Sequence, residues 1–432
     1  MHFQPERRAT GFDFFYNMDE VPPTREEDEY CMFLKDEGYG DLNAIHGVRH
    51  CLYMQPQRSL VPEELHGSAW VADRAIEYLD RTRGRRPFLM WAGFIHPHPP
   101  LDIPDSWADL YEGQIPPPAK IQGTLPQLAE ETKQLGCLDA PGALNRMREM
   151  YASAISLMDH HLGRILDRLD QLGLTDNTLL IFTSDHGEML GDLGTYQKFL
   201  PYDASSKIPM IMRWPGRVEA GSRRQDFADL NDLLPTFLDA AGIEYPADYD
   251  LPGESLLGKP AKKDRTVQYL EHQRGNKRWC SLRNRRFKYV HYYGDRPCLY
   301  DLLTDPGETV NLLDSGPLSS EAQTALEALR AELIHYEARF GLPGHVKDGE
   351  FTVFPPYTAQ PFYETTKQDF VDMLLPRERE AMRDIRDEIL QAIEKEKTVK
   401  LRENHTAEIL SQMGYDREFI ETLLLRADAQ GN

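Results

Sequence analysis

Two neighbouring residues, Asp185 and His186, form the pattern in this sequence that is best suited to holding a metal ion. They follow directly on the apolar run Thr178–Ser184 (TLLIFTS) and precede Gly187, which lets the chain turn sharply and approach other backbone closely. A carboxylate oxygen and an imidazole nitrogen side by side can both ligate one divalent cation. The alternative is an ordinary turn in which Asp185 caps the next segment, and a tripeptide alone does not separate the two.

Two further segments carry groups that suit an anionic ester. His98 stands in the proline-rich stretch His96–Pro100, and prolines restrict the backbone in a way that helps to aim an imidazole at a leaving-group oxygen. Lys198 follows His186 by twelve residues. On a loop over an anionic site, its ammonium group could stabilise the charge of a tetrahedral sulfate or phosphate. Because lone histidines and lysines are more often structural or solvated, both roles are hypotheses.

Apolar runs precede these residues, and they predict buried strands that alternate with helices. Helical spacing of apolar residues over 66–82 is followed by the continuous apolar run Pro87–Ile95 (PFLMWAGFI). A long amphipathic helix is predicted from Leu144 to Gly173, and it leads into the run Thr178–Thr183. The second run is rich enough in β-forming residues to be a strand buried on both faces.

The alternation continues along the chain and predicts an α/β fold with a mainly parallel sheet flanked by helices. Ile208–Trp214 has the pattern of another strand, and Leu230–Ala241 has that of another helix. Ligands of such folds bind beyond the carboxyl ends of the strands. Asp185, His186 and His98 all stand at such ends, so we expect their side chains to reach one crevice.

The pattern changes after Pro260, where a smaller α+β subdomain is predicted. Its short antiparallel strands are expected over Val267–His272, Trp279–Leu282 and Arg286–Tyr293. A charged helical sequence near the C-terminus has one apolar stripe, which favours docking on the protein's own core over an oligomer contact. The predicted parts are an α/β catalytic domain over 1–262, an antiparallel-sheet subdomain over 263–346 and a helical extension over 347–432.

The overall composition is that of an acidic globular protein. The 432 residues suggest two or three domains, and 41% hydrophobic residues provide for a large core. A formal net charge of -21 disfavours nucleic acid and anionic membranes as partners, and no run of 18 apolar residues predicts a membrane span. The cysteines are odd in number and lack a Cys-x-x-Cys pair, which favours free structural thiols. They are Cys31, Cys51, Cys137, Cys280 and Cys298.

Taken in order, these segments resemble the sulfatase family of the alkaline-phosphatase superfamily. The central match runs through GLTDNTLLIFTSDHGEMLGD and YQKFLPYDASSKIPMIMRWPG. The resemblance covers roughly residues 1 to 315, and the order of so many segments is far more specific than a single motif. Further matching segments are Asp232–Thr236, Ala241-Gly242, Phe287–Tyr289, Leu299–Leu302, Asp305–Glu308 and Asn311-Leu312.

The resemblance implies a role for each residue that matches the family's motifs. Asp185 and His186 would be metal ligands, His98 would contact the sulfate and serve the leaving group, and Lys198 would be a second sulfate contact. His2 belongs to this catalytic set as well, because the opening MHFQP is similar to the family's Gly-Lys-x-His segment. The histidine of that segment also faces the ester.

Two parts of the family's active site have no counterpart in this sequence. Sulfatases act through a formylglycine that is made from Cys, or sometimes Ser, in a Cys-x-Pro-Ser-Arg-like motif, and none of the five cysteines stands in one. Two adjacent metal-binding aspartates of the family would precede Met1. We therefore expect a chain that begins inside the active-site sequence and that has no measurable arylsulfatase activity as it stands.

The resemblance also implies one divalent metal ion. Calcium is the ion that the family suggests. Relatives vary between Asn and His after the metal-binding Asp, and here the residue is His186. An imidazole makes the pocket less purely oxygen-based, so manganese or another transition ion competes with calcium.

The predicted function is the hydrolysis of a sulfate ester of a small molecule or a saccharide. A phosphonate monoester or phosphodiester hydrolase of the same superfamily is the alternative, since it uses the same residues on a similar tetrahedral anion. A noncatalytic remnant or binding protein is a third hypothesis because the nucleophile is missing. The walls of the substrate pocket are expected in the loops Gly113–Gly142 and Tyr245–Gly258, whose sequences do not identify the substrate. The sequence leaves localisation open, and a homo-oligomer is possible.

Overall fold

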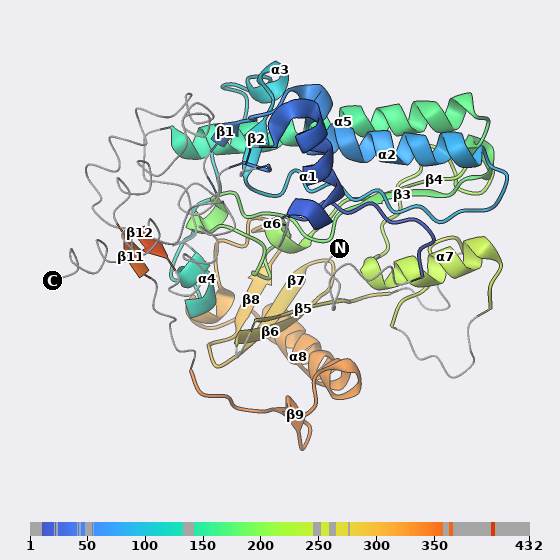
Figure 1. The fold of residues 1–432 in the computed structure, drawn as a ribbon. Coiled ribbons are helices and arrows are strands. Elements are labelled where there is room, and N and C mark those ends of the chain that lie inside the picture. The colour runs from blue at the N-terminus through green and yellow to red at the C-terminus, as the bar shows by residue number, and fades with distance from the viewer. Residues whose placement is uncertain are drawn as a thin grey trace. The chain divides into compact units, whose positions relative to one another are not determined.

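In the computed structural model, the chain folds into two compact units (Figure 1). Unit 1 contains Met1–Pro117, Gly136–Leu174 and Gln360–Asn432, and unit 2 contains Pro118–Leu135 and Thr175–Ala359. Each unit is described by itself below. The residues that the structure describes are 11–20, 22, 25–40, 42, 45–47, 54, 56–132, 142–244, 252–258, 265–274, 277–356, 363–365 and 399–401.

Unit 1 combines helices with short strands. A parallel pair is formed by β1 and β2, in which Gln57 lies opposite Asp102. A second, antiparallel pair is formed by β11 and β12. The helices are α1 (Glu29–Leu34), α2 (Gly67–Thr82), α3 (Asp105–Ala108) and α5 (Ala143–Gln171), and the strands are β1 (Pro56–Arg58), β2 (Leu101–Ile103), β11 (Tyr363–Thr365) and β12 (Val399–Leu401).

The two long helices α2 and α5 lie side by side and confirm the predicted helices (Figure 1). Their apolar stripes are buried, as helical periodicity requires. Charged side chains link the helices beside that seam, where Arg164 donates to Asp73 at 2.5 Å and Arg168 to Asp80 at 2.7 Å. The helix α5 ends where the sequence predicts, because Gly173 has a φ of 67° that favours glycine.

The predicted strand over Pro87–Ile95 is wrong. The described residues of this segment are extended but belong to no strand. Their apolar side chains are largely exposed, with Leu89 at 62% and Trp91 at 53%. A strand needs a neighbour that completes its hydrogen-bond ladder, and a run of apolar residues does not show whether that neighbour is present.

Unit 2 contains a two-stranded antiparallel sheet of β3 (Leu180–Thr183) and β4 (Met210–Arg213). Both strands were predicted. The prediction that the first is buried on both faces is wrong, because all four residues of β3 are half-buried. In β4, Ile211 is 60% exposed. The fold is of the predicted α/β class. Among the described strands, β1 and β2 pair in parallel, whereas β3 and β4 pair in antiparallel orientation.

The helices of unit 2 are short apart from the last one. The predicted helix over Leu230–Ala241 is present as a 3-10 turn, Leu230–Asp232, followed by α7 (Leu233–Ala241). Gly242 ends it, as predicted, with a φ of 68°. The remaining helices are α4 (Gln127–Thr132), α6 (Asp203–Ser206) and α8 (Ser320–Phe340).

A four-stranded antiparallel sheet forms the second half of unit 2 and confirms the predicted strands of a smaller α+β part. Its strand order is β5-β6-β7-β8. The fourth strand and the helix α8 were not predicted. The bounds are β5 (Gln268–Arg274), β6 (Lys277–Arg283), β7 (Phe287–Tyr293) and β8 (Cys298–Asp301), followed by the small hairpin of β9 (Val346–Lys347) and β10 (Glu350–Phe351).

The central strands β6 and β7 are buried on both faces. Residues of one face, such as Cys280 and Tyr289, pack with α8. Residues of the other face, such as Trp279 and Val290, pack against Leu200 and other apolar side chains of the segment that follows β3. The sheet therefore supports the loop in which Lys198 stands.

Several predictions of the sequence can be compared with the described residues only in part. Cys31, Cys280 and Cys298 are free and buried, in agreement with structural thiols. The other two cysteines, His2 and the C-terminal striped helix lie outside the described residues. The proposed boundaries at 262 and 346 stay predictions.

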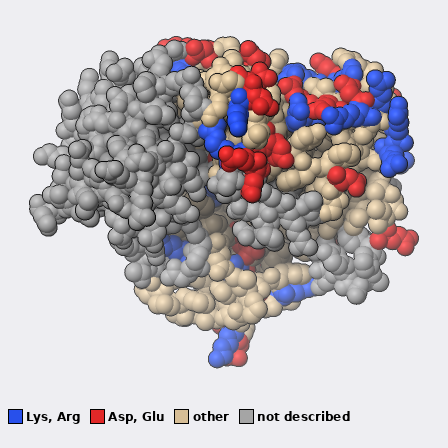
Figure 2. Space-filling view, viewed as in Figure 1, with Lys and Arg blue, Asp and Glu red and all other residues tan. Residues whose placement is uncertain are grey.

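Charged side chains lie on the face of unit 1 that Figure 2 shows. Acidic and basic side chains are interspersed over the face of α2 and α5 that Figure 2 shows. No helix in the described part of the chain is both long and apolar enough to cross a lipid bilayer.

Candidate functional site

Asp185 and His186 follow β3 directly, and local hydrogen bonds orient both side chains. The His186 backbone N–H donates to Asp185 Oδ1 at 2.9 Å. His186 Nδ1 donates to the carbonyl oxygen of Gly187 at 2.7 Å, so Nε2 carries the lone pair of the neutral ring. That nitrogen lies 3.7 Å from Asp185 Oδ2. The structure therefore presents a nitrogen and an oxygen donor side by side.

These two donors fit a divalent metal ion. The Asp185 side chain is 80% exposed and that of His186 is 27% exposed, so an ion can approach from solvent. A bond from Nδ1 to a carbonyl is the usual way to hold a metal-binding imidazole in one tautomer. An ion that binds nitrogen and oxygen at about 2.0 to 2.2 Å can bridge donors at this separation. The pair supplies two ligands, so such an ion needs others.

Gly187 holds the end of β3 against α6. Its N–H donates to the carbonyl oxygen of Ser205 at 2.7 Å. A Cβ atom at this position would lie 2.1 Å from the carbonyl oxygen of Ala204. Close approach of two backbone segments, rather than a left-handed conformation, is therefore what requires glycine here. The contact fixes the residues that follow Asp185 and His186.

The loop that carries Lys198 closes on the buried carboxylate of Glu188. Oε1 of Glu188 accepts the backbone N–H of Gln197 at 2.5 Å and that of Leu190 at 3.3 Å. Burial raises the pKa of Glu188, while these N–H groups and the charge of Lys198 act in the opposite direction. Lys198 thus follows directly on an anchored residue, and its Nζ lies 5.7 Å from the ring centroid of Phe199. On the other side of the loop, Trp279 Nε1 donates to the carbonyl oxygen of Phe199 at 2.8 Å.

A buried ion cluster ties the end of this loop to the four-stranded sheet. Lys288 of β7 is fully buried, and its Nζ contacts Asp203 Oδ1 at 2.6 Å, Glu308 Oε1 at 2.7 Å and the carbonyl oxygen of Pro201 at 3.0 Å. Arg283 of β6 donates to Asp203 Oδ1 at 2.8 Å. Two cations therefore face two carboxylates at the start of α6.

The charges of this cluster shift the pKa values of its two acids in opposite directions. Burial acts to raise the pKa of Asp203, but Lys288 and Arg283 outweigh it, and the pKa lies below its usual value. For Glu308 burial prevails over the attraction of Lys288, so the pKa is raised. Sequence reasoning missed the cluster. The alternation of Lys288 with Val290 and Tyr292 in β7 was a signal that could have revealed a lysine on an inward face.

His98 belongs to unit 1 and is described there. Its backbone N–H closes a turn on the carbonyl oxygen of Ile95 at 3.0 Å. Its Nδ1 contacts the carbonyl oxygen of Pro99 at 2.7 Å and Glu20 Oε1 at 3.2 Å. These contacts hold the ring of His98 in a defined orientation within unit 1. Of the five predicted site residues, Asp185, His186 and Lys198 thus share one loop system, His98 is in the other unit and His2 is not described.

A second group of metal-ligand side chains lies buried in unit 1, where sequence reasoning did not place a site. His96 Nε2 contacts Asp102 Oδ1 at 3.0 Å, and His66 Nε2 contacts the Asp102 carbonyl oxygen at 3.2 Å. Burial, together with neighbouring His96, lowers the pKa of His66 to about 3, which keeps the ring neutral. The sequence pointed to His96 only as a neighbour of His98, because His66 is 30 residues away.

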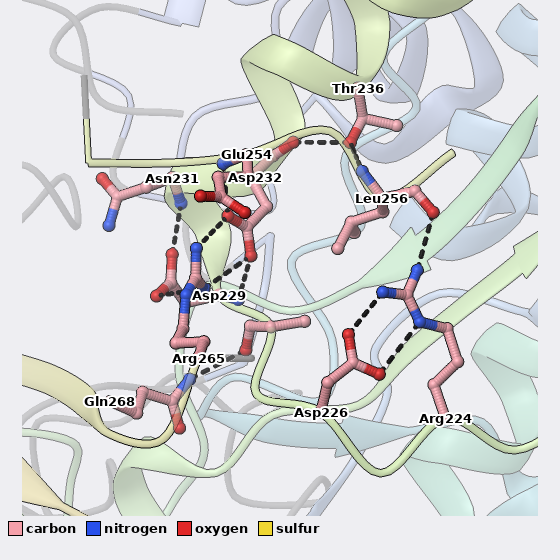
Figure 3. A network of polar contacts seen from close by, with 11 residues as sticks. Arg224, Asp226, Asp229, Asn231, Asp232, Thr236, Glu254, Leu256, Arg265 and Gln268 are labelled. Atoms are coloured by element: carbon pink, nitrogen blue, oxygen red, sulfur yellow. Dashed lines mark hydrogen bonds and ion pairs between the residues drawn. The ribbon is translucent and has the colours of Figure 1, made fainter. Parts of the chain in front are cut away.

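The segment Asp232–Thr236, which the resemblance singled out, has a structural role at the start of α7 (Figure 3). Asp232 accepts the N–H of Glu254 at 2.8 Å and an N–H of Arg265 at 2.7 Å. Thr236 Oγ1 accepts the N–H of Leu256 at 2.9 Å. These bonds hold residues 252–258, part of one predicted pocket wall, against the helix.

Figure 3 also shows the arginine carboxylate pairs that complete this network. Arg265 donates to Asp229 Oδ2 at 3.2 Å. Arg224 pairs with Asp226 and donates to the carbonyl oxygen of Leu256 at 2.7 Å. Burial and the nearby Asp232 raise the pKa of Asp229. The network gives the 252–258 segment a defined position within unit 2.

Comparison with known proteins gives matches over most of the chain. The family model described as Sulfatase matches residues 4–243, and the model of the C-terminal part of N-sulphoglucosamine sulphohydrolase matches residues 191–337. An arylsulfatase of Clostridium perfringens is 28% identical over 357 residues, which are 77% of this chain and 73% of that protein. An N-acetylglucosamine-6-O-sulfatase of Bacteroides thetaiotaomicron is 32% identical over 200 residues, which are 43% of this chain and 36% of that protein.

Among solved structures, the phosphonate monoester hydrolase of Agrobacterium radiobacter is similar with a TM-score of 0.61. The sequences are 24% identical, and the match covers 76% of this chain and 73% of that chain. This likeness concerns the fold. The sulfatase model, by contrast, matches the sequence over more than half of the chain. The protein therefore belongs to the sulfatase family of the alkaline-phosphatase superfamily.

Proposed function

We propose that the protein comes from a lineage of sulfuric ester hydrolases and that the loop after β3 binds the sulfate group of an ester. The observation that supports this most directly is the geometry of Asp185 and His186. Because Nδ1 of His186 is bonded to the Gly187 carbonyl oxygen, Nε2 presents its lone pair 3.7 Å from Asp185 Oδ2. Metal ligation is the chemistry that such a pair fits best.

In this proposal each residue has a defined task. Asp185 and His186 hold a divalent cation, and this ion, when bound, supplies positive charge for the nonbridging oxygens of the ester. Lys198 adds its ammonium group to the same anion, and Glu188 keeps the lysine loop closed. For His98, which belongs to unit 1, we propose the leaving-group role that the resemblance implies, and the bond from its Nδ1 to Pro99 orients the ring.

The substrate class in the proposal is a sulfate ester of a small molecule or a saccharide. The names of the relatives in Clostridium and Bacteroides support it, because both are sulfatases. The second candidate is a phosphonate monoester, which the name of the structural neighbour favours. Both substrates present a tetrahedral anion to the same side chains.

The first test of the proposal concerns anion binding. Binding of inorganic sulfate and of phenylphosphonate is measured by titration calorimetry with Ca²⁺ or Mn²⁺ present, and again after chelation. We expect sulfate to bind more tightly than phenylphosphonate and to need the cation. Binding should weaken at least about tenfold in Asp185→Asn, which removes a charged ligand of the cation, and in Lys198→Met, which removes a positive charge that attracts the anion.

The control for this test is Lys347→Met, which removes an exposed lysine of unit 2 and should leave sulfate binding unchanged. Equal sulfate binding by the Asp185→Asn variant and the unchanged protein would overturn the assignment of this loop. Tighter binding of phenylphosphonate would favour the second candidate.

The second test concerns turnover. None of the five cysteines is followed by the residues that formylglycine formation needs, so we propose that this chain does not hydrolyse sulfate esters by itself. Hydrolysis of 4-nitrophenyl sulfate, followed by absorbance with Ca²⁺ and with Mn²⁺, should stay at the rate of the blank. A rate above the blank that Asp185→Asn abolishes would contradict the proposal.

A further inference from the structure

We propose that His66, His96 and Asp102 form a second metal-binding site, in unit 1, for zinc or a similar transition-metal ion. These are not the residues that the proposed function uses, and the inference does not depend on that function. All three side chains are buried, and their ligand atoms lie within 4.8 Å of one another. The site would have two imidazole nitrogens and one carboxylate oxygen as protein ligands.

The distances between the donor atoms suit a small ion. His96 Nε2 lies 3.0 Å from Asp102 Oδ1, and His66 Nε2 lies 3.9 Å from Asp102 Oδ2. An ion bound tetrahedrally at about 2.0 to 2.1 Å from each donor keeps its donors about 3.4 Å apart. The distances from the two imidazoles to the two carboxylate oxygens lie on either side of this value, so either oxygen of Asp102 could be the ligand. All ligand atoms, including the two imidazole nitrogens, lie within 4.8 Å of one another.

The charge of the group also favours a cation. The carboxylate of Asp102 is buried, and the ion-pair partners that it has in the structure are the imidazoles of His66 and His96. Burial favours the neutral form of His66, which is the form that binds metals. A buried carboxylate between two imidazoles is stabilised by a dication, because the dication supplies positive charge that neutral rings do not.

The donor set selects the class of ion. Two imidazole nitrogens and one carboxylate are the ligands of many zinc sites that have three protein ligands and one water. Calcium prefers six to eight oxygen ligands, which this group does not provide. The site should therefore prefer Zn²⁺, or Co²⁺ as its spectroscopic substitute, over Ca²⁺.

The three ligands come from separate pieces of defined structure. His66 precedes the first residue of α2, and Asp102 lies in β2 opposite Gln57 of β1. A Cβ atom on Gly47 would lie 3.0 Å from Asp102 Cβ, so the backbone of Gly47 closes one side of the group. Such packing limits the movement of Asp102 and arranges the ligands in advance.

Metal binding would replace two hydrogen bonds of the His66 ring, one from Nε2 to the Asp102 carbonyl oxygen and one from the Ser68 N–H to Nδ1, and the second gives a specific signature. In the structure, His66 Nδ1 accepts the N–H of Ser68 at 3.2 Å as the cap of α2, so the ring proton is on Nε2. Metal binding through Nε2 moves that proton to Nδ1 and breaks the capping bond. A capping bond stabilises a protein less than a metal ion held by three buried ligands does. The backbone amide of Ser68 should therefore report metal binding.

The test measures metal content in the whole chain with the other candidate site removed. The double variant Asp185→Ala/His186→Ala is incubated with Zn²⁺, passed through a desalting column and analysed by mass spectrometry for metal. We expect one equivalent of zinc. Adding Asp102→Asn, which keeps the shape of the side chain but removes its charge, should lower zinc affinity at least about a hundredfold. Adding His335→Ala, at an exposed histidine of α8, should leave the affinity unchanged.

Two further measurements keep the result decisive if a variant folds poorly. Circular dichroism spectra and thermal unfolding curves show whether the Asp102→Asn protein is folded. In the protein with intact ligands, Zn²⁺ should shift the NMR signal of the Ser68 amide, and Co²⁺ should give a visible absorption band. The proposal is overturned if the double variant binds no zinc, if Asp102→Asn binds zinc equally well, or if the Ser68 amide does not respond.

Discussion

The imidazole of His291 lies flat on the ring of Phe351, with centroids 3.8 Å apart. Burial, with a smaller contribution from the positive charge of Arg330, lowers its pKa to about 4. The ring is therefore neutral at physiological pH and remains so in mild acid. In the unfolded chain a histidine has a pKa of about 6.5, so folding changes its affinity for protons.

This difference predicts how stability depends on pH. Between about pH 6.5 and 4 the unfolded chain binds a proton at His291 that the folded protein does not, so the free energy of unfolding falls as the pH falls. Replacing His291 by Gln should make the decrease from pH 7.5 to pH 5 smaller by up to about 2 kcal/mol. Urea unfolding at both pH values measures this. An equal decrease in both proteins would show that His291 titrates alike in the two states.

Individual residues of the site were predictable to different degrees. Asp185 and His186 were predicted as metal ligands because the strand end, the donor types and the glycine coincide within a few residues, and the assignment stays a prediction. The tautomer of His186 was not predictable, because it depends on the carbonyl of Gly187 in three dimensions. The buried charges of Lys288 and Asp203 were missed because they are 85 residues apart in the sequence.

At the scale of elements, the end of β3 depends on its contact with α6. The backbone N–H of Gly187 bonds to Ser205, and no room is left for a side chain between the two segments. The contact joins the segment of Asp185 and His186 to the helix whose first residue, Asp203, receives Lys288 and Arg283. The strand end, the lysine loop and the antiparallel sheet are thus one connected support.

The contact predicts a strong effect of a single methyl group. Gly187→Ala would place Cβ 2.1 Å from the Ala204 carbonyl oxygen, which must move away. We expect a loss of about 3 kcal/mol in the free energy of unfolding of the protein, measured with urea. The control is Gly163→Ala within α5, where nothing lies within 4 Å of the new Cβ. This control should raise stability by about 0.5 to 1 kcal/mol, and a similar gain at position 187 would contradict the prediction.

The helices α2 and α5 could be located from the sequence for a physical reason. The hydrogen bonds of α2 and α5 are internal, so their apolar periodicity and the stop at Gly173 are sufficient to locate them. A strand depends on a neighbour that can lie anywhere in the sequence. The run Pro87–Ile95 has strand composition without a strand partner among the described residues, and β8 was recognised only as part of a family segment.

At the scale of the molecule, a large negative charge coexists with exposed apolar side chains. The formal net charge is -21. Trp91 in unit 1 and Ile211, Leu234 and Ile243 in unit 2 are each at least 44% exposed. Exposed apolar groups promote association, whereas like charges on two molecules oppose it. The balance depends on ionic strength.

Self-association should therefore increase with salt. At about 0.01 M ionic strength charge repulsion extends roughly 30 Å and should keep the chains apart, whereas at about 1 M it is screened within roughly 3 Å. Sedimentation velocity should show larger species at high salt. Ile211→Lys should reduce them, because it places a charge on an exposed apolar position of β4. The exposed polar control Thr324→Lys should not, and association that decreases with salt would count against the explanation.

The hydrogen bond from Trp279 to the Phe199 carbonyl gives the protein an internal optical probe. The indole is buried in the sheet, and the carbonyl belongs to the residue next to Lys198. Indole emission responds to changes at its N–H, so a displacement of the lysine loop by an arriving anion would alter the fluorescence of this one side chain. A protein that retains Trp279 as its single tryptophan would let ligand occupancy be followed in real time without a label.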